Sequence, residues 1–200
     1  MNTLSTTEEI IENLKRKDAV FDTLYKKFGL ISINLNTNIY ESIISNIIGQ
    51  QLSDKVKKVI YERFINLVKE IKPTNILNTS TEDIRACGIS YSKIKYIKEL
   101  SQKVHNNELN FDDLEKYNDE DLIAEFRKIN GVGEWTAEML AIFSLGRENI
   151  FSKKDAALRN GIKKAKNYQT LSEQRFNNLR KKYSPYCSYA SLYFYALNDE

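Results

Sequence analysis

The 200-residue sequence has few residues that interrupt or cross-link a chain: two prolines, seven glycines and two cysteines. So little proline and glycine argues against a β-protein with many turns. The two thiols, Cys87 and Cys187, cannot supply a four-thiolate iron–sulfur or zinc site, and their number does not suggest a disulfide framework.

Long apolar runs are also missing. The sequence has no stretch of about 18 apolar residues, so it predicts no membrane span. The N-terminal stretch MNTLSTTEEIIENLKRKD lacks the apolar core of a signal peptide. We therefore expect a cytoplasmic protein, nucleoid-associated if the source is bacterial, that does not bind membranes. The single histidine, His105, lies in the polar stretch His-Asn-Asn-Glu and is interpreted as a surface residue.

The net charge is +3, and it is unevenly distributed. Residues 147–182 carry eleven Lys or Arg and three Asp or Glu, about +8 in net charge. Such a basic segment can face the phosphates of a nucleic acid. Solvated helical faces have the same composition, and from charge alone they are the better interpretation.

Helical periodicity dominates the chain. Apolar residues repeat at three- and four-residue intervals over 39–48, 56–68, 94–104, 122–126 and 135–142. Candidate capping residues precede two of these segments, at 36–38 and at 118–121. A convincing alternation with period two is not found. The pattern predicts an all-α protein of about ten helices joined by short connections.

Two glycines, Gly131 and Gly133, form a tight turn between predicted helices at about 119–128 and 134–145. Glycine permits a left-handed backbone and close approach of another backbone, and the amides that begin a helix bind anions such as phosphate. A plain helix-ending turn explains the pattern equally well. About twenty residues later Asp155 follows Lys153 and Lys154. Taken alone, Asp155 is best explained as the N-cap of a helix.

Three motifs occur in order along the chain: Ile47-Ile-Gly-Gln-Gln-Leu-Ser53, then Ile129-Asn-Gly-Val-Gly-Glu-Trp-Thr-Ala137, then Phe151-x-x-x-Asp155-x-x-Leu-x-x-Gly161. Residues 84–89 with Lys93 add a fourth block. Together they resemble the helix–hairpin–helix (HhH-GPD) DNA glycosylase superfamily over about residues 36–197. Within it, the Gly-x-Trp-Thr-Ala pattern resembles the alkylpurine enzymes of the 3-methyladenine DNA glycosylase II type.

The resemblance implies a two-lobed helical fold, with the helix–hairpin–helix near 119–145 and a cleft between the lobes. Residues 36–130 would form one lobe, which ends in the first helix of the hairpin motif. Residues 1–35 and 131–200 would form the second lobe, with the hairpin, the essential aspartate and the basic C-terminal helices. A separate N-terminal β-domain is not expected, and the protein is expected to be a monomer.

The implied reaction is base-excision repair of double-stranded DNA that contains damaged bases. The enzyme flips a damaged base out of the duplex and hydrolyses its N-glycosidic bond, while Asp155 stabilises the cationic sugar. In strand-cleaving relatives a lysine stands two residues after the second hairpin glycine and forms a Schiff base. Trp135 stands there instead, which implies a monofunctional hydrolase without AP lyase activity. The implied substrates are 3-methyladenine and 7-methylguanine.

The same resemblance assigns the other site residues. Trp135, Met139 and Tyr195 would line the base pocket, and Gln51 would fill the gap that the flipped nucleotide leaves. The remaining DNA contacts would come from Gly131, Gly133, Thr136, Gln50, Ser53, Lys153 and Lys154. No cofactor is expected except a Na⁺ or K⁺ ion on the backbone carbonyls of Arg127, Ile129 and Val132.

Three residues depart from the family pattern: Asn130 replaces the hairpin proline, and Tyr183 and Cys187 replace a tryptophan and an arginine. These departures leave the substrate open, so a glycosylase for mismatched thymine or uracil, or for oxidised guanine, is an alternative. A second alternative is a noncatalytic helix–hairpin–helix DNA-binding module. Asp155 argues against that module, because a carboxylate repels phosphates.

Overall fold

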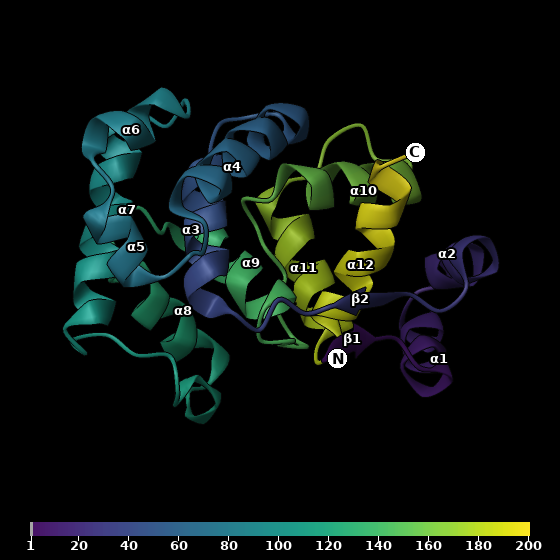
Figure 1. Ribbon diagram of the computed structural model, residues 1–200. Coiled ribbons are helices and arrows are strands. Elements are labelled where there is room, and N and C mark those ends of the chain that lie inside the picture. Colours follow the sequence, from purple (N-terminus) through teal and green to yellow (C-terminus); the bar gives the residue numbers. More distant parts are fainter. Residues whose placement is uncertain (1) are drawn as a thin grey trace. The chain divides into compact units, whose positions relative to one another are not determined.

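The computed structural model describes residues 2–200 (Figure 1). Within them lie twelve α-helices, one short 3-10 helix and two strands of three residues each. The predicted all-α class is therefore confirmed, with more helices than the expected ten. None of the helices in this range is long and apolar enough to cross a membrane.

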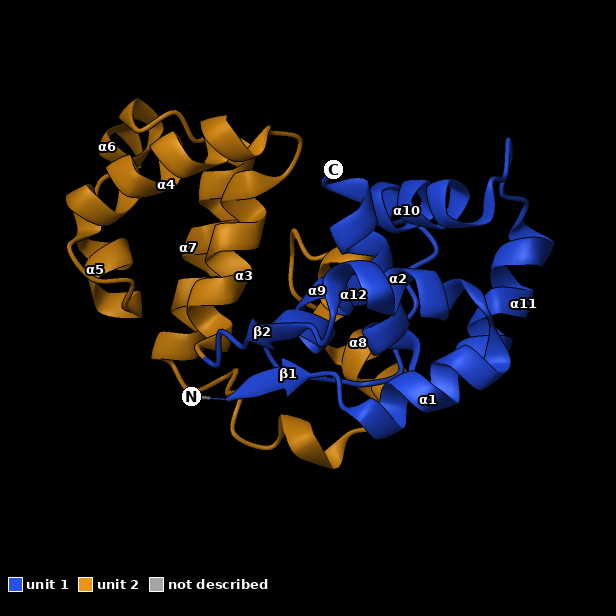
Figure 2. Ribbon diagram, turned by 90° about the vertical axis from the view of Figure 1, so that its right-hand side faces the viewer, with its two compact units in different colours: residues 1–37, 138–200 blue, residues 38–137 orange. Residues whose placement is uncertain are grey.

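The chain divides into two compact units, residues 1–37 with 138–200 and residues 38–137 (Figure 2). The second boundary lies inside helix α9 (Glu134–Phe143). The sequence-based division instead ended the first lobe at residue 130, before the hairpin. The glycine turn marks a break in the sequence pattern, but the boundary between the two units lies after this turn. The helix α9 continues without interruption across that boundary.

The unit of residues 38–137 comprises α3 (Ile39–Gly49), α4 (Asp54–Val68), α5 (Pro73–Asn78), α6 (Thr81–Ala86), α7 (Tyr91–His105), η1 (Leu114–Lys116) and α8 (Asp119–Arg127). The two predicted helix starts are confirmed by their caps. The side chain of Asn38 accepts a hydrogen bond from the Glu41 amide at 3.1 Å, and that of Asn118 accepts one from the Asp121 amide at 2.9 Å. His105 is exposed at the end of α7, as predicted.

The other unit comprises β1 (Thr3–Ser5), α1 (Glu8–Lys17), α2 (Val20–Phe28), β2 (Ser32–Asn34), α10 (Ala156–Lys166), α11 (Glu173–Tyr183) and α12 (Cys187–Asn198). The strands pair antiparallel, with Leu4 opposite Ile33. The sequence does not predict them, because three residues are too few to reveal an alternation with period two.

Helix α10 packs against α12 (Figure 1). Gly161 makes this packing close. A Cβ atom at Gly161 would lie 2.0 Å from the carbonyl oxygen of Phe194, so no other residue fits here without moving the backbone. Asp155 immediately precedes α10, and Tyr195 follows Phe194 in α12. The contact at Gly161 therefore fixes the two helices that carry these side chains.

A buried ion-pair cluster joins α1, α10 and α11. Asp18 accepts hydrogen bonds from Lys166 Nζ at 2.8 and 2.6 Å and from the Tyr183 hydroxyl at 2.8 Å. Lys182 Nζ lies 3.2 Å from the same carboxylate. Burial alone would raise the pKa of Asp18, but the hydrogen bonds from Lys166 and Tyr183 lower this pKa to about 2. Part of the basic segment at 147–182 thus holds the fold together.

Candidate active site

Asp155 lies at the N-terminus of α10 and is 4% exposed. Its Oδ1 atom accepts a hydrogen bond from the Leu158 amide at 2.7 Å, so the residue is an N-cap. Its other oxygen, Oδ2, accepts a hydrogen bond of 3.3 Å from the hydroxyl of Tyr195. Capping and a chemical role are therefore compatible, because each uses a different oxygen of the carboxylate. The helix dipole also favours a negative charge at this position.

Tyr195 lies close to two other predicted site residues of this unit, Asp155 and Met139. Its hydroxyl lies 4.0 Å from Met139 Sδ, and its ring centroid lies 6.2 Å from that of Phe143. Burial, followed by the negative charge of Asp155, raises the pKa of the Tyr195 hydroxyl. Tyr195 therefore stays a neutral phenol that donates its proton in a hydrogen bond. The structure thus brings Asp155, Met139 and Tyr195 together.

Glu138, which the sequence-based prediction does not include, is linked by hydrogen bonds through Ser152 to Asp155. Its Oε2 atom accepts a hydrogen bond of 2.5 Å from the hydroxyl of Ser152, a fully buried residue. The carbonyl of Ser152 in turn accepts a hydrogen bond from the Asp155 amide at 3.3 Å. One signal was available: Glu138 is the only charged residue in the mostly apolar run Trp135-Thr-Ala-Glu-Met-Leu-Ala-Ile-Phe143.

In the unit of residues 38–137, the two hairpin glycines differ in their surroundings. Gly131 has φ +89°, and a Cβ atom there would lie 2.6 Å from the ring of Tyr96. Gly131 therefore needs to be glycine for two reasons, its left-handed backbone and its contact with Tyr96. Gly133 has no left-handed φ, and a Cβ atom there would meet open space. The contacts and the backbone within the fold therefore do not require glycine at position 133.

Gln50 connects the end of α3 to the hairpin. Its Nε2 atom donates a hydrogen bond to the carbonyl of Gly131 at 2.7 Å. Lys93 donates to the carbonyls of Ile48 at 3.0 Å and Gln50 at 2.7 Å, and burial lowers the pKa of this lysine. The amide of Gln50, predicted to contact DNA, is thus engaged in holding the hairpin.

The other predicted DNA contacts of this unit differ in exposure. Gln51 is exposed and has φ +58°, a backbone conformation that is strained for a residue other than glycine. Ser53 is exposed at the start of α4. Trp135 is 38% exposed, whereas Thr136 is only 3% exposed. Thr136 is therefore buried almost completely, unlike its neighbour Trp135.

Lys153 and Lys154 are both exposed beside Asp155. Lys153 forms an ion pair with Glu173 at 2.8 Å. Other cations of the basic segment bind within the protein: Arg159 donates to the carbonyl of Lys153 at 3.3 Å, and Lys164 donates to the carbonyl of Asn198 at 3.0 Å. The charge excess of residues 147–182 is therefore only partly available to a nucleic acid.

Comparison with known proteins identifies the family. A family model described as HhH-GPD superfamily base excision DNA repair protein matches residues 44–185. The chain belongs to this superfamily.

Individual proteins that are similar to this HhH-GPD protein have the names of 3-methyladenine glycosylases. It is 31% identical over 173 residues to Bacillus subtilis YfjP, which bears the name of a DNA-3-methyladenine glycosylase; the match covers 80% of this chain and 59% of YfjP. The crystal structure of a Bacillus halodurans DNA-3-methyladenine glycosidase is similar with a TM-score of 0.85 and 30% identity, over 99% of this chain and 93% of that one.

Schizosaccharomyces pombe 3-methyladenine DNA glycosylase Mag1, in complex with abasic DNA, is similar with a TM-score of 0.83 and 26% identity, over 94% of this chain and 95% of that one. The chain spans somewhat more than half the length, 59% and 56%, of the first curated relatives that it matches.

The three departures from the HhH-GPD pattern have local explanations. Asn130 donates a hydrogen bond to Glu99 at 2.9 Å, which attaches the hairpin to α7 without a proline. Tyr183 contributes its hydroxyl to the Asp18 cluster. Cys187 is fully buried, with its Sγ atom 3.2 Å from the carbonyl of Arg180. All three side chains therefore have hydrogen-bond partners within the fold.

The superfamily implies a monovalent cation at the hairpin, and the local backbone is compatible with one. The Val132 amide donates to the carbonyl of Ile129 at 3.0 Å, which closes the turn that contains these carbonyls and that of Arg127. A carbonyl oxygen keeps a second lone pair when it accepts one hydrogen bond. Among residues 2–200, no group of three or more His, Cys, Asp or Glu side chains is placed to hold a metal ion.

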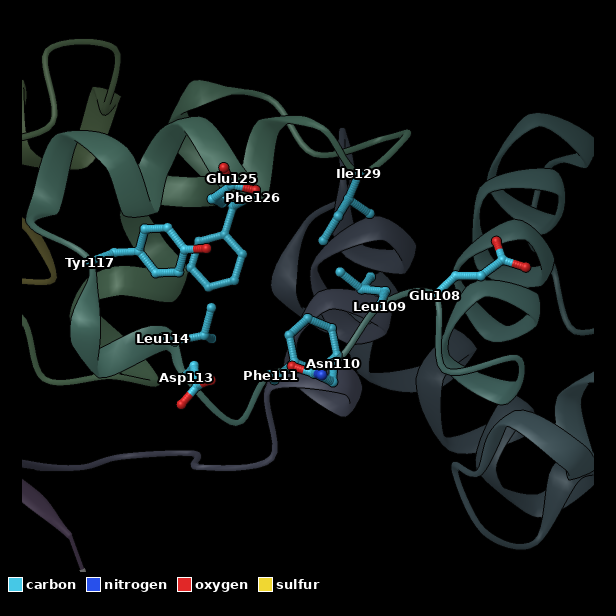
Figure 3. A pocket seen from close by; sticks show the side chains of 10 residues that line it. All are labelled: Glu108, Leu109, Asn110, Phe111, Asp113, Leu114, Tyr117, Glu125, Phe126 and Ile129. Carbon is cyan, nitrogen blue, oxygen red and sulfur yellow. The ribbon is translucent and has the colours of Figure 1, made fainter.

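A cavity of about 290 Å³ lies in the unit of residues 38–137. Figure 3 shows its lining side chains, which come from residues 108–117 and from α8 and its end. Of the predicted site residues, only Ile129 lines it. The cavity lining contains none of Asp155, Met139 and Tyr195.

Proposed function

We propose that the protein is a monofunctional DNA glycosylase that flips alkylated purines, 3-methyladenine and 7-methylguanine, out of duplex DNA and removes them by hydrolysis. The observation that carries this proposal is the carboxylate of Asp155. It is buried at a helix N-terminus, one oxygen is fixed by the cap, and the other is paired with Tyr195. The names of the two similar glycosylase structures support the same substrate class.

The proposed chemistry requires one well-placed anion. The bond between C1′ and the base nitrogen breaks with both electrons going to the base, so an alkylated, cationic purine leaves as a neutral molecule. Positive charge develops on the sugar, and the Asp155 carboxylate stabilises it. Water then forms the new bond to C1′ and releases a proton that Asp155 accepts. Little acid catalysis is needed, which is consistent with the single, exposed histidine.

Trp135 supports the monofunctional assignment. A lyase step needs an amine that attacks C1′ to form a Schiff base. The hairpin 130–137 contains no lysine, and Trp135 occupies the place of the lysine found in strand-cleaving members. The half-buried Lys93 donates hydrogen bonds to two backbone carbonyls.

For DNA binding, we assign the phosphate contacts to the backbone amides of Gly131, Gly133 and the first turn of α9. Ser53, Lys153 and Lys154 would add contacts that make binding sensitive to salt. We assign to Gln51 the place in the duplex left by the flipped nucleotide. Its exposed side chain and left-handed backbone support this assignment, since such strain is concentrated at functional sites.

The test is base release from methylated duplex DNA by the wild type and by Asp155→Asn. Asparagine caps a helix as well as aspartate does, so the variant keeps α10 but loses the charge. The expected loss of the single-turnover rate is on the order of 100-fold. Full activity of the variant would remove Asp155 from the chemistry. If the wild type releases no alkylated purine, the substrate assignment is wrong, and a complex trapped by borohydride would contradict the monofunctional assignment.

A further inference from the structure

Glu138 supplies a second carboxylate to the site of Asp155 and Tyr195. Ser152, fully buried, holds one oxygen of Glu138 at 2.5 Å, and the backbone of Ser152 binds the amide of Asp155 at 3.3 Å. Glu138 is therefore fixed relative to the turn that presents Asp155. The proposed reaction above uses only Asp155, so the role of Glu138 is open.

The negative charge of Glu138 acts on the hydroxyl of Tyr195. The pKa of Tyr195 is raised by burial, by the charge and hydrogen bond of Asp155, and in addition by the charge of Glu138. Two carboxylates thus act on one phenol, whose hydroxyl lies 3.3 Å from Asp155. A positive charge bound next to Tyr195 would be attracted by both carboxylates, and in a site with little water this attraction is stronger than at a surface.

We propose that Glu138 is a specificity-determining residue that makes the site select nucleotides carrying a positive charge. This inference rests on the proposed glycosylase function. An alkylated purine nucleotide carries one positive charge before cleavage, and this charge moves from the base to the sugar as the bond breaks. The total charge stays at one, and for Glu138 to act on selectivity its attraction for this charge has to be equally strong in the bound ground state and in the transition state. A neutral damaged nucleotide gains much less from the same carboxylate.

The kinetic consequence is specific. An interaction that is equally strong in the ground state and in the transition state changes the apparent binding constant and leaves the chemical rate constant unchanged. Glu138→Gln removes the charge but keeps an oxygen that can accept the hydrogen bond of Ser152. For 7-methylguanine in duplex DNA, this variant should therefore bind substrate more weakly in single-turnover experiments and cleave it at the same saturated rate.

The decisive measurement compares two duplexes that differ at one position. One contains a protonated pyrrolidine in place of the sugar, and the other contains a neutral tetrahydrofuran. The ratio of their dissociation constants reports the preference for positive charge without requiring catalysis. Glu138→Gln should lower this preference several-fold, because the variant removes one of the two carboxylate charges that attract the protonated pyrrolidine. Glu138→Asp, which keeps the charge, should keep most of the preference.

Glu148→Gln is the matched control. Glu148 also accepts a hydrogen bond from a hydroxyl, that of Tyr189 at 2.7 Å, and it is exposed in the same unit. The control should leave the ratio unchanged. If Glu138→Gln does not fold, Ser152→Ala replaces it, because this change releases Glu138 from the hydrogen bond that holds it, and the ratio should again fall.

An unchanged ratio, or an equal loss of affinity for both duplexes, would overturn the proposal, since the second result describes a structural role. A lowered saturated rate with unchanged binding would overturn it too. In these cases base release by the wild type still stands, so the proposed function survives. If the wild type neither releases 7-methylguanine nor binds either duplex, the proposed function fails, and this inference fails with it.

Discussion

Asp18→Asn tests how much the buried ion-pair cluster contributes to stability. The side chain of Asp18 is 6% exposed and that of Lys166 is 17% exposed. The pKa of Asp18 is about 2 in the folded protein, against an ordinary value of 3.8. This difference corresponds to about 2 kcal/mol of folding free energy at neutral pH. The variant also leaves the charge of Lys166 with a weaker partner at a position of low exposure. This should add about 1 kcal/mol or more to the loss of folding free energy.

The pH dependence of this loss has a definite sign. Because the pKa of Asp18 is lowered on folding, its stabilisation is fully present above about pH 4 and is lost as the pH falls through about 2. The free energies of unfolding of wild type and Asp18→Asn should therefore differ by a constant amount between pH 7 and pH 5. The difference should shrink between about pH 4 and pH 2.

Urea unfolding followed by circular dichroism at several pH values measures this difference. Asp22→Asn, a change of an exposed carboxylate in the neighbouring helix α2, is the control and should change the stability by less than about 0.5 kcal/mol. If Asp18→Asn unfolds at the same urea concentration as the wild type at pH 7, the cluster does not stabilise the fold. A difference that stays the same down to pH 2 would refute the assignment to the ionised carboxylate.

Three further predictions concern close packing and burial. Gly161→Ala should destabilise the protein by about 2 kcal/mol or more in urea unfolding, because its Cβ atom would lie 2.0 Å from the Phe194 carbonyl; wild-type stability would show that α10 and α12 can separate freely. Gly131→Ala should lower stability by about 1–3 kcal/mol, since it has φ +89°. Gly133→Ala should keep the stability and weaken duplex binding in a titration; equal effects of the two changes would contradict the distinction between these glycines. In the folded protein, Cys187 should resist a thiol reagent at pH 8, because burial raises the pKa of its thiol to about 12, and rapid labelling without unfolding would disprove this.

The sequence by itself determined the features that depend on local spacing. The helix starts after Asn38 and Asn118 follow from capping residues next to apolar repeats, and the structure has both caps. The ordered motifs around Gly131 and Asp155 identified the superfamily, because a hairpin and a helix N-terminus are each made from neighbouring residues. The same local reasoning recognised Asp155 as a cap, which it is.

Only the tertiary structure decided which side chains meet across long stretches of chain. Glu138 and Ser152 lie fourteen residues apart, and Gln50 and Gly131 lie eighty-one apart. No periodicity pairs such residues, because their meeting depends on how whole helices pack. The structure therefore shows that Gln50, an expected DNA contact, also supports the hairpin, and that Glu138 is hydrogen-bonded to the turn that carries Asp155. It also separated the two hairpin glycines, which look alike in sequence, because only one of them faces the ring of Tyr96.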